Sequence, residues 1–180
     1  MVHLITEVMI QFTAFPNLIT ENLILRQYKM SDENEVFLLR SSDEVNKFID
    51  RPKANSIDDA RKFIEKITYG EYKDAFIWAI ELKDRKGFIG SVCLLRFTLE
   101  NNSAEVGYEM LPAFQGKGIV QEAVKKILEY GFQVLGLDTI NAVIHPDNIK
   151  SIKLAERFGF VRTGQLEEKF VIYSLRGLAG

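Results

Sequence analysis

The sequence predicts a single α/β domain built on a mixed, mostly antiparallel β-sheet, and three observations carry this prediction. The chain has 180 residues, which is the length of one ordinary domain. Three apolar, β-rich segments follow one another in the middle of the chain with short polar turns between them, which predicts an antiparallel meander. The periodicity then becomes helical and returns to that of a strand, which predicts one parallel, right-handed strand–helix–strand unit over about 104–144.

The N-terminal third predicts one strand and two helices. The first strand is expected at Leu23–Arg26. Ser31, followed by acidic residues, predicts a helix start with a side-chain cap and acids in the first turn. Ser56 and Asp59 form a capping-box pattern ahead of apolar residues at helical spacing, and Gly70 is expected to end that second helix.

The remaining elements are predicted from changes in apolar period. The meander strands are expected at 76–82, 88–97 and 104–111, with turns at 83–87 and 100–103. An amphipathic helix that begins at Ile119, a strand at 139–144, a helix at 148–158 and two strands at 160–162 and 169–175 follow. The helix at 148–158 places Lys150, Lys153 and Arg157 on its polar side.

Composition and charge exclude several classes of protein. Hydrophobic residues make up 47% and charged residues 27%, which excludes a disordered chain. The net charge of −2 argues against a general nucleic-acid binder, because few phosphate counterions would be released. Cys93 is the only cysteine, so neither an intrachain disulfide nor a cysteine-rich metal site is expected, and His3 has no partner for a metal. No apolar run suits a membrane span and no signal peptide is recognised, so we expect a cytoplasmic protein.

The segment 115–120, Gln-Gly-Lys-Gly-Ile-Val, carries the strongest chemical signal. It joins a strand to an amphipathic helix, and its two glycines leave consecutive backbone N–H groups free to point at one anion beside the helix N-terminus. A purely structural turn is the alternative on spacing alone. A P-loop is excluded because Ile119 follows Gly118, and a dinucleotide fingerprint is excluded because Gln121 stands where its third glycine belongs.

Four segments together resemble the GNAT acetyltransferase superfamily, and in particular its RimJ/RimL branch, across about residues 18–175. The loop 115–120 is similar to the Q/R-x-x-G-x-G/A acyl-coenzyme A loop. Residues 18–26 and 104–108 resemble the opening and fourth strands of that branch, and 148–160 resembles its N-x-x-S…E-x-x-G-F signature. The departures are Val120 for Gly or Ala, Asn22 for Arg, and Ala155 where many members have a tyrosine general acid.

The resemblance implies one GNAT domain over 1–180, a twisted sheet whose fourth and fifth strands splay apart, and acetyl-CoA as co-substrate in that wedge, with no metal. It implies three catalytic candidates, namely Glu105 as general base, Glu109 as second candidate for the base, and Ser151 for protonating the leaving thiolate. The implied cofactor-binding residues are Met110, Leu111, Gln115, Gly116, Lys117, Gly118, Ile119, Val120, Asn148 and Ser151.

Several of these residues have a simpler structural interpretation that stays open at this point. Glu105 suits a solvent-facing strand position, and Asn148 with Ser151 suits a helix N-cap. The basic side chains of the last helix suit a solvated face as well as a site for the ribose 3′-phosphate. His145, Cys93 and Trp78 are more simply structural or core residues.

The activity implied is direct transfer of acetyl from acetyl-CoA to a primary amine in a ternary complex, with a backbone N–H near 106–108 stabilising the oxyanion. A protein N-terminal α-amine is the favoured acceptor, because an amine of pKa about 7.7–8.0 is partly neutral at pH 7 without a strong base. The alternatives are a small amine, such as a polyamine, an aminoglycoside or an amino acid, and a non-catalytic acyl-CoA sensor. The segments 43–55 and 162–172 are expected to line the acceptor pocket, no membrane or nucleic-acid partner is expected, and homodimer formation is left open.

Overall fold

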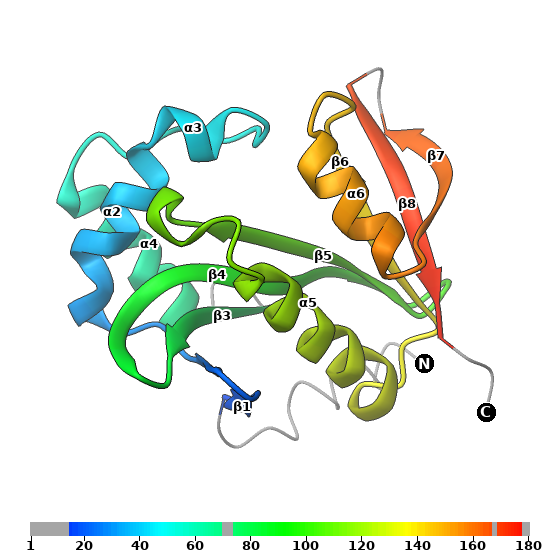
Figure 1. The fold of residues 1–180 in the computed structure, drawn as a ribbon, viewed down its shortest axis with the longest axis horizontal. Helices are drawn as coiled ribbons and strands as arrows, with labels where there is room; N and C mark the ends of the chain where they lie inside the picture. Colours follow the sequence, from blue (N-terminus) through cyan, green and yellow to red (C-terminus); the bar gives the residue numbers. More distant parts are fainter. Residues whose placement is uncertain (1–14, 70–73, 167–168, 178–180) are drawn as a thin grey trace.

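The chain forms one eight-stranded sheet with helices packed against both faces (Figure 1). This computed structural model describes residues 15–69, 74–166 and 169–177. The strands in chain order are β1 (Leu18–Ile19), β2 (Leu23–Arg26), β3 (Ala75–Leu82), β4 (Arg85–Thr98), β5 (Ser103–Met110), β6 (Thr139–Ile144), β7 (Val161–Leu166) and β8 (Phe170–Arg176). The α-helices are α2 (Glu33–Ser41), α3 (Asp43–Asn46), α4 (Ile57–Thr68), α5 (Ile119–Glu129) and α6 (Ile149–Arg157). Three further helical turns are the 3₁₀ turns η1 (Met30–Asp32) and η2 (Pro112–Phe114) and the π turn η3 (Tyr130–Val134).

The predicted meander and the strand–helix–strand unit are both confirmed. Strands β2 to β5 pair antiparallel in succession, and β5 pairs parallel with β6 across α5. The first meander turn is tighter than predicted, because Leu82 pairs with Arg85 and only Lys83 and Asp84 lie between them. β1 and α3 were not predicted, since elements of two and four residues carry no measurable period. Gly70, the expected end of α4, lies outside the described residues.

The helix start predicted at Ser31 is wrong by two residues. α2 begins at Glu33, after η1, and no described side chain caps it. The Asp32 carboxylate accepts two hydrogen bonds of 2.8 Å from the Arg26 guanidinium, which is itself buried. Because a buried guanidinium must be compensated, Asp32 is held by β2 and is not available to α2. The cap predicted for α4 is confirmed: Ser56 Oγ accepts from the Asp59 N–H, and the Asp59 carboxylate accepts from the Ser56 N–H.

The core lies on both faces of the sheet, as strand alternation requires. Trp78 and Ile80 of β3 face the layer that includes α5, and Ala79 between them faces α2 and α4. Trp78 is fully buried, as predicted, and its indole N–H donates to the Pro16 carbonyl at 2.7 Å. Trp78 packs against the rings of Phe76 and Tyr130, and this packing fixes the centre of the sheet.

Strands β5 and β6 separate after three residue pairs. Ser103, Ala104 and Glu105 pair with residues 139–141, and no β5–β6 pair follows among the described residues. β6 pairs instead with β8 along its whole length, so β6, β8 and β7 diverge from β5 together with α6 (Figure 1). The splayed wedge predicted for these two strands is therefore present, and it opens toward Met110.

Candidate active site

The loop that leaves β5 is shaped to hold an anion at the N-terminus of α5. Gly116 and Gly118 adopt φ angles of 74° and 78°, which an L side chain rarely adopts. Gly118 is the N-cap of α5, and no described side chain caps that helix. The first backbone N–H groups of α5 therefore keep their hydrogen-bonding capacity and the partial positive charge of the helix end. The loop and helix start predicted for 115–120 are present, and the anion site there stays a prediction.

Two loop side chains make contacts within the protein that the sequence did not indicate. The Gln115 amide donates to the Met110 carbonyl at 3.1 Å, so it fastens the loop to the end of β5. Lys117 extends over the Phe114 ring, with Nζ 5.6 Å from the ring centroid. Lys117 is not among the residues that line the hollow beside the loop, although the sequence suggested it as a local cation.

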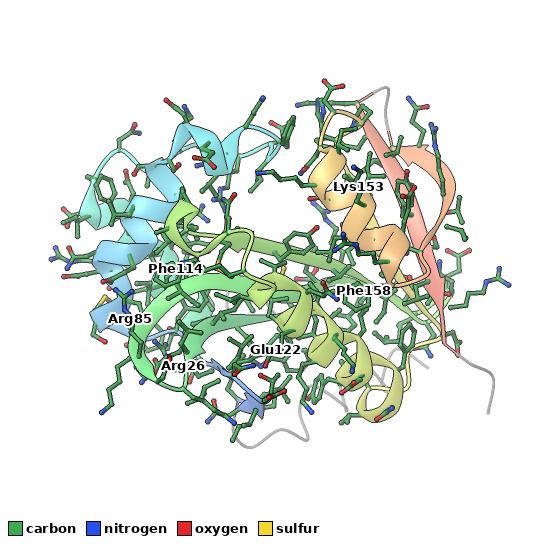
Figure 2. All side chains as sticks on the ribbon, in the orientation of Figure 1. Arg26, Arg85, Phe114, Glu122, Lys153 and Phe158 are labelled. Atoms are coloured by element: carbon green, nitrogen blue, oxygen red, sulfur yellow. The ribbon has the colours of Figure 1, made fainter. Side chains whose placement is uncertain are left out.

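A hollow of about 710 Å³, here called the loop hollow, lies between this loop and α6. Its loop side is formed by Gln115, Gly116, Gly118, Ile119 and Val120. Its α6 side includes Lys150, Lys153 and Arg157, and Figure 2 labels Lys153 on α6 and Phe114 on η2. For these basic side chains the sequence left two interpretations, a solvated face and a phosphate site. In the structure they border the loop hollow, where a polyanion could contact them.

A second hollow of about 550 Å³, here called the strand hollow, occupies the wedge between β5 and β6. Both segments expected to line an acceptor pocket contribute to it, through Ile49 and Arg51 from one and Leu166 and Phe170 from the other. The two hollows share seven lining residues, so they adjoin. The shared residues are Phe48, Ile49, Tyr108, Glu109, Asn148, Ser151 and Leu154.

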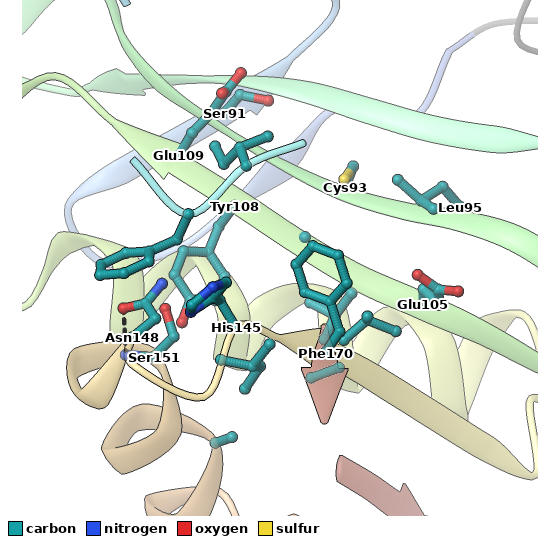
Figure 3. A pocket seen from close by; sticks show the side chains of 18 of the residues that line it. Ser91, Cys93, Leu95, Glu105, Tyr108, Glu109, His145, Asn148, Ser151 and Phe170 are labelled. Atoms are coloured by element: carbon teal, nitrogen blue, oxygen red, sulfur yellow. Dashed lines mark hydrogen bonds between the residues drawn. The ribbon is translucent and has the colours of Figure 1, made fainter. Parts of the chain in front are cut away.

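Tyr108 and Ser151 both stand at this junction. Burial raises the pKa of the Tyr108 hydroxyl, and the Ser151 hydroxyl opposes that rise only in part. Asn148 caps α6, because its Oδ1 accepts from the Ser151 N–H at 3.3 Å (Figure 3). The cap uses the backbone N–H of Ser151 and not its hydroxyl. The helix cap is thus confirmed, and the catalytic role of Ser151 stays a prediction.

Glu105 and Glu109 both line the strand hollow, and each is paired with an arginine. Glu105 accepts from Arg96 at 2.7 Å, and Glu109 lies 2.6 Å from an Arg51 nitrogen. Glu105 is the last β5 residue paired with β6, at the closed end of the wedge, whereas Glu109 lies in its open part beside Ser91 (Figure 3). The arginine of Glu105 is 64% exposed and that of Glu109 is 17% exposed. Glu105 is thus the carboxylate whose partner solvent can replace.

The backbone of β5 offers free groups on the side of the wedge. Because Leu111 donates its N–H to the Ile89 carbonyl, alternation along the β4–β5 ladder turns the N–H groups of Tyr108 and Met110 toward β6. β6 has already diverged at that point. Leu111, one of the implied cofactor-binding residues, has no free N–H for this role, and its carbonyl already accepts from the Phe114 N–H.

His145 and Cys93 line the strand hollow without a reactive arrangement. His145 Nδ1 accepts from the Asp147 N–H at 3.2 Å, and its ring lies between Phe48 and Phe170. Burial raises the pKa of the Cys93 thiol to about 12, so the thiol stays protonated near pH 7. This state does not support a covalent acetyl-cysteine.

Within the described ranges, no group of three or more His, Cys, Asp or Glu side chains is placed to hold a metal ion. Across the same residues, no helix is both long and apolar enough to cross a bilayer.

Sequence reasoning missed the side chain of Tyr108 and the two arginines. Tyr108 entered the prediction only as part of a strand motif. Neither hydrophobic periodicity nor residue spacing indicates that a tyrosine in a strand faces a helix more than forty residues later. Arg51 and Arg96 come from a loop and from the end of β4, and neither stands in a recognisable motif. Ala155 stands where many family members have a tyrosine general acid. A search for another tyrosine near the loop could therefore have found Tyr108.

Comparison with known proteins gives consistent matches across most of the chain. The sequence model of the acetyltransferase (GNAT) domain matches residues 22–161. The N-acetyltransferase YoaA of Bacillus subtilis strain 168, itself uncharacterized, is 35% identical over 156 residues, covering 86% of this chain and 88% of that protein. Spermidine N-acetyltransferase from Vibrio cholerae, solved with CoA and spermine, superposes with a TM-score of 0.75 at 23% identity, covering 87% of this chain and 96% of that one. RimJ from Mycobacterium smegmatis, solved with CoA-disulfide, superposes with a TM-score of 0.74 at 19% identity, covering 86% and 82%.

Proposed function

The chain belongs to the GNAT acetyltransferase family, and on that premise we propose that it transfers acetyl from acetyl-CoA to the α-amine of a protein or peptide N-terminus. The membership and the GNAT fold make it an N-acetyltransferase. The observation that carries the proposal further is the pair of adjoining hollows, which meet at Tyr108 and Ser151. One hollow suits the coenzyme, the other suits the acceptor, and the acetyl group belongs at their junction. We assign the chain to the RimJ/RimL type on the sequence motifs.

The loop hollow supplies groups for each part of the coenzyme. The α5 N-terminus and the loop N–H groups suit the pyrophosphate, as at other helix N-termini. The N–H groups of Tyr108 and Met110 suit the amide carbonyls of the pantetheine arm, as an added strand would. Lys150, Lys153 and Arg157 suit the ribose 3′-phosphate.

The proposed reaction is direct and needs no covalent enzyme intermediate. The neutral amine attacks the thioester carbon, and a β5 backbone N–H stabilises the oxyanion that forms. As the C–S bond breaks, the coenzyme thiolate takes a proton from the Tyr108 hydroxyl, and Ser151 beside it can resupply that proton. The proton released by the amine reaches Glu105 through water.

The two paired carboxylates favour an acceptor amine that arrives partly neutral. An α-amine is about 10–20% neutral near pH 7, whereas a lysine amine is neutral only to the order of 0.1% or less. Since both Glu105 and Glu109 already neutralise arginines, neither is free to act as a strong base without losing its partner. An N-terminal α-amine fits this weak base better than a lysine side chain.

An acetyl-transfer assay tests the proposal. Purified protein is incubated with acetyl-CoA and a panel of free-N-terminus peptides, their N-acetylated counterparts as matched controls, and small amines. We expect thiol release and a mass increase of one acetyl group only with free α-amines. Thiol release no faster than without acceptor, for every amine, would contradict transfer by this chain. Exclusive transfer to lysine side chains would contradict the α-amine assignment.

Glu105→Gln is expected to lower kcat/KM at pH 7 by about 10²-fold, because a positioned base is removed with little change in volume. The rate of this variant should rise toward alkaline pH, where the amine deprotonates in solution, and the loss should be smaller for acceptors of low amine pKa. The pH–rate profile with one peptide acceptor measures both effects.

Glu109→Gln serves as the comparison variant. It leaves Arg51 without its carboxylate in a half-buried place, so it should lower the stability by roughly 1–3 kcal/mol in a thermal melt. Full kcat/KM for Glu105→Gln at pH 7 would remove Glu105 from the mechanism and transfer the role of base to Glu109.

A further inference from the structure

The carboxylates of the strand hollow are already paired with basic side chains. Three carboxylates line it, Asp50, Glu105 and Glu109. Asp50 accepts from Lys169 at 2.7 Å, and the two glutamates are paired with Arg96 and Arg51. The lining therefore presents no carboxylate without a basic partner among the described residues.

This charge balance disfavours an acceptor that carries several positive charges. A polyamine entering the wedge would bring two or more ammonium groups out of water, and each would need an anionic partner to offset its desolvation. Here the charge of each carboxylate is already offset by a guanidinium or an ammonium, so an entering ammonium would have to compete with that cation. Displacing Arg51 from Glu109 would leave that half-buried guanidinium unpaired.

The hollow offers aromatic surface instead. The His145 ring lies 5.3 Å from the Phe48 ring and 6.0 Å from the Phe170 ring, measured between centroids. Phe48 comes from the loop after α3 and Phe170 from the start of β8, so the His145 ring contacts rings from two distant segments. Figure 3 labels His145 and Phe170. Both phenylalanines are only partly buried, and Ile49 and Leu166 extend the apolar lining. Such half-covered rings gain free energy when an apolar or aromatic group packs against them.

We propose that the acceptor is a primary amine flanked by an uncharged aromatic or large apolar group, such as an N-terminal residue with an aromatic side chain, and that polyamines are poor acceptors. This inference rests on the proposed function, since it assigns the strand hollow to the acceptor. The side chain beside the amine packs against Phe48, His145 and Phe170, and the amine itself points along β5 toward Tyr108.

The test compares acceptors that differ only in the first residue. Tetrapeptides beginning with Phe, Leu, Ser or Lys, otherwise identical, are assayed beside spermidine at saturating acetyl-CoA. We expect kcat/KM for the Phe peptide to exceed that for the Ser peptide by about tenfold or more, as an apolar pocket discriminates. Spermidine should be slower than every uncharged peptide.

Phe170→Ala tests whether the aromatic lining of the strand hollow selects the acceptor. It should shrink the preference for Phe over Ser several-fold and leave the KM for acetyl-CoA unchanged, because Phe170 lines only the strand hollow. Tyr69→Ala, at an exposed ring on the end of α4 outside both hollows, is the matched control and should keep the preference.

The outcomes separate this inference from the function on which it rests. If peptides are acetylated but spermidine is as good an acceptor, or if Phe170→Ala keeps the preference for Phe, the inference is overturned while acetyl transfer stands. If no peptide is acetylated, the α-amine proposal itself fails.

Discussion

Replacing Tyr108 with Phe should lower kcat by about 10²-fold or more, with little change in acetyl-CoA affinity, because a positioned general acid is typically worth that much. The hydroxyl is the only atom removed, and the ring keeps its packing at the junction of the two hollows. Burial keeps the pKa of this hydroxyl above its ordinary value, so it stays protonated at every pH where the acceptor is tested. Single-turnover rates and calorimetric titration with acetyl-CoA measure the two quantities.

Ser151→Ala completes the test as a double-mutant cycle with Tyr108→Phe. If the two hydroxyls act as one proton-donating unit, the double variant should be about as slow as Tyr108→Phe alone. Ser151→Ala should barely change the melting temperature, since Asn148 Oδ1 accepts from the backbone N–H of Ser151, which alanine retains. Two outcomes would contradict the assignment of Tyr108 as the acid. One is a loss of kcat in the double variant equal to the product of the two single losses, and the other is an undiminished kcat for Tyr108→Phe.

Gly118→Glu should weaken acetyl-CoA binding by well over tenfold, which is more than about 1.4 kcal/mol. The substitution places a carboxylate at the N-cap of α5, where the pyrophosphate is expected, and it strains a backbone held at φ 78°. No described atom lies within 4 Å of a β-carbon built there, so the loss would come from charge and strain with no collision inside the protein. Calorimetry with acetyl-CoA gives the affinity.

Gly136→Glu is the matched control for that loss. Gly136 has φ 67°, its β-carbon would also meet no described atom within 4 Å, and it lines neither hollow. It should suffer comparable backbone strain and gain the same charge, yet keep acetyl-CoA affinity. Equal affinities of the Gly118 variant and the wild type would show that the loop does not hold the coenzyme.

The elements proposed to position the coenzyme could be predicted from sequence, because each has a local cause. The two glycines, the apolar rows of α5 and the N-cap at Asn148 are all visible within a few residues. The wedge was predictable from the family resemblance, and the structure places it after Glu105.

The acceptor side could not be predicted in detail, because its contacts join residues far apart in the chain. The pairing of Arg51 with Glu109 and the packing of Phe48 and Phe170 on His145 depend on how a loop and a distant strand meet. The helix start predicted at Ser31 failed for a different reason, because the η1 turn precedes α2 and the Asp32 carboxylate is paired with Arg26, six residues away. A nearby ion pair outweighed the local capping preference there.

The short ladder between β5 and β6 divides the sheet into two leaves joined by residues 103–105 and 139–141. A ligand lying in the wedge would act as a mechanical tie between the leaves, bonding to the open edge of β5 on one side and to α6 on the other. Bound coenzyme should therefore slow amide hydrogen exchange in β6 and α6 more than in the meander, because only three residue pairs join that leaf to β5. The rate of amide hydrogen exchange in the leaf formed by β6, β8, β7 and α6 would therefore show whether the site is occupied.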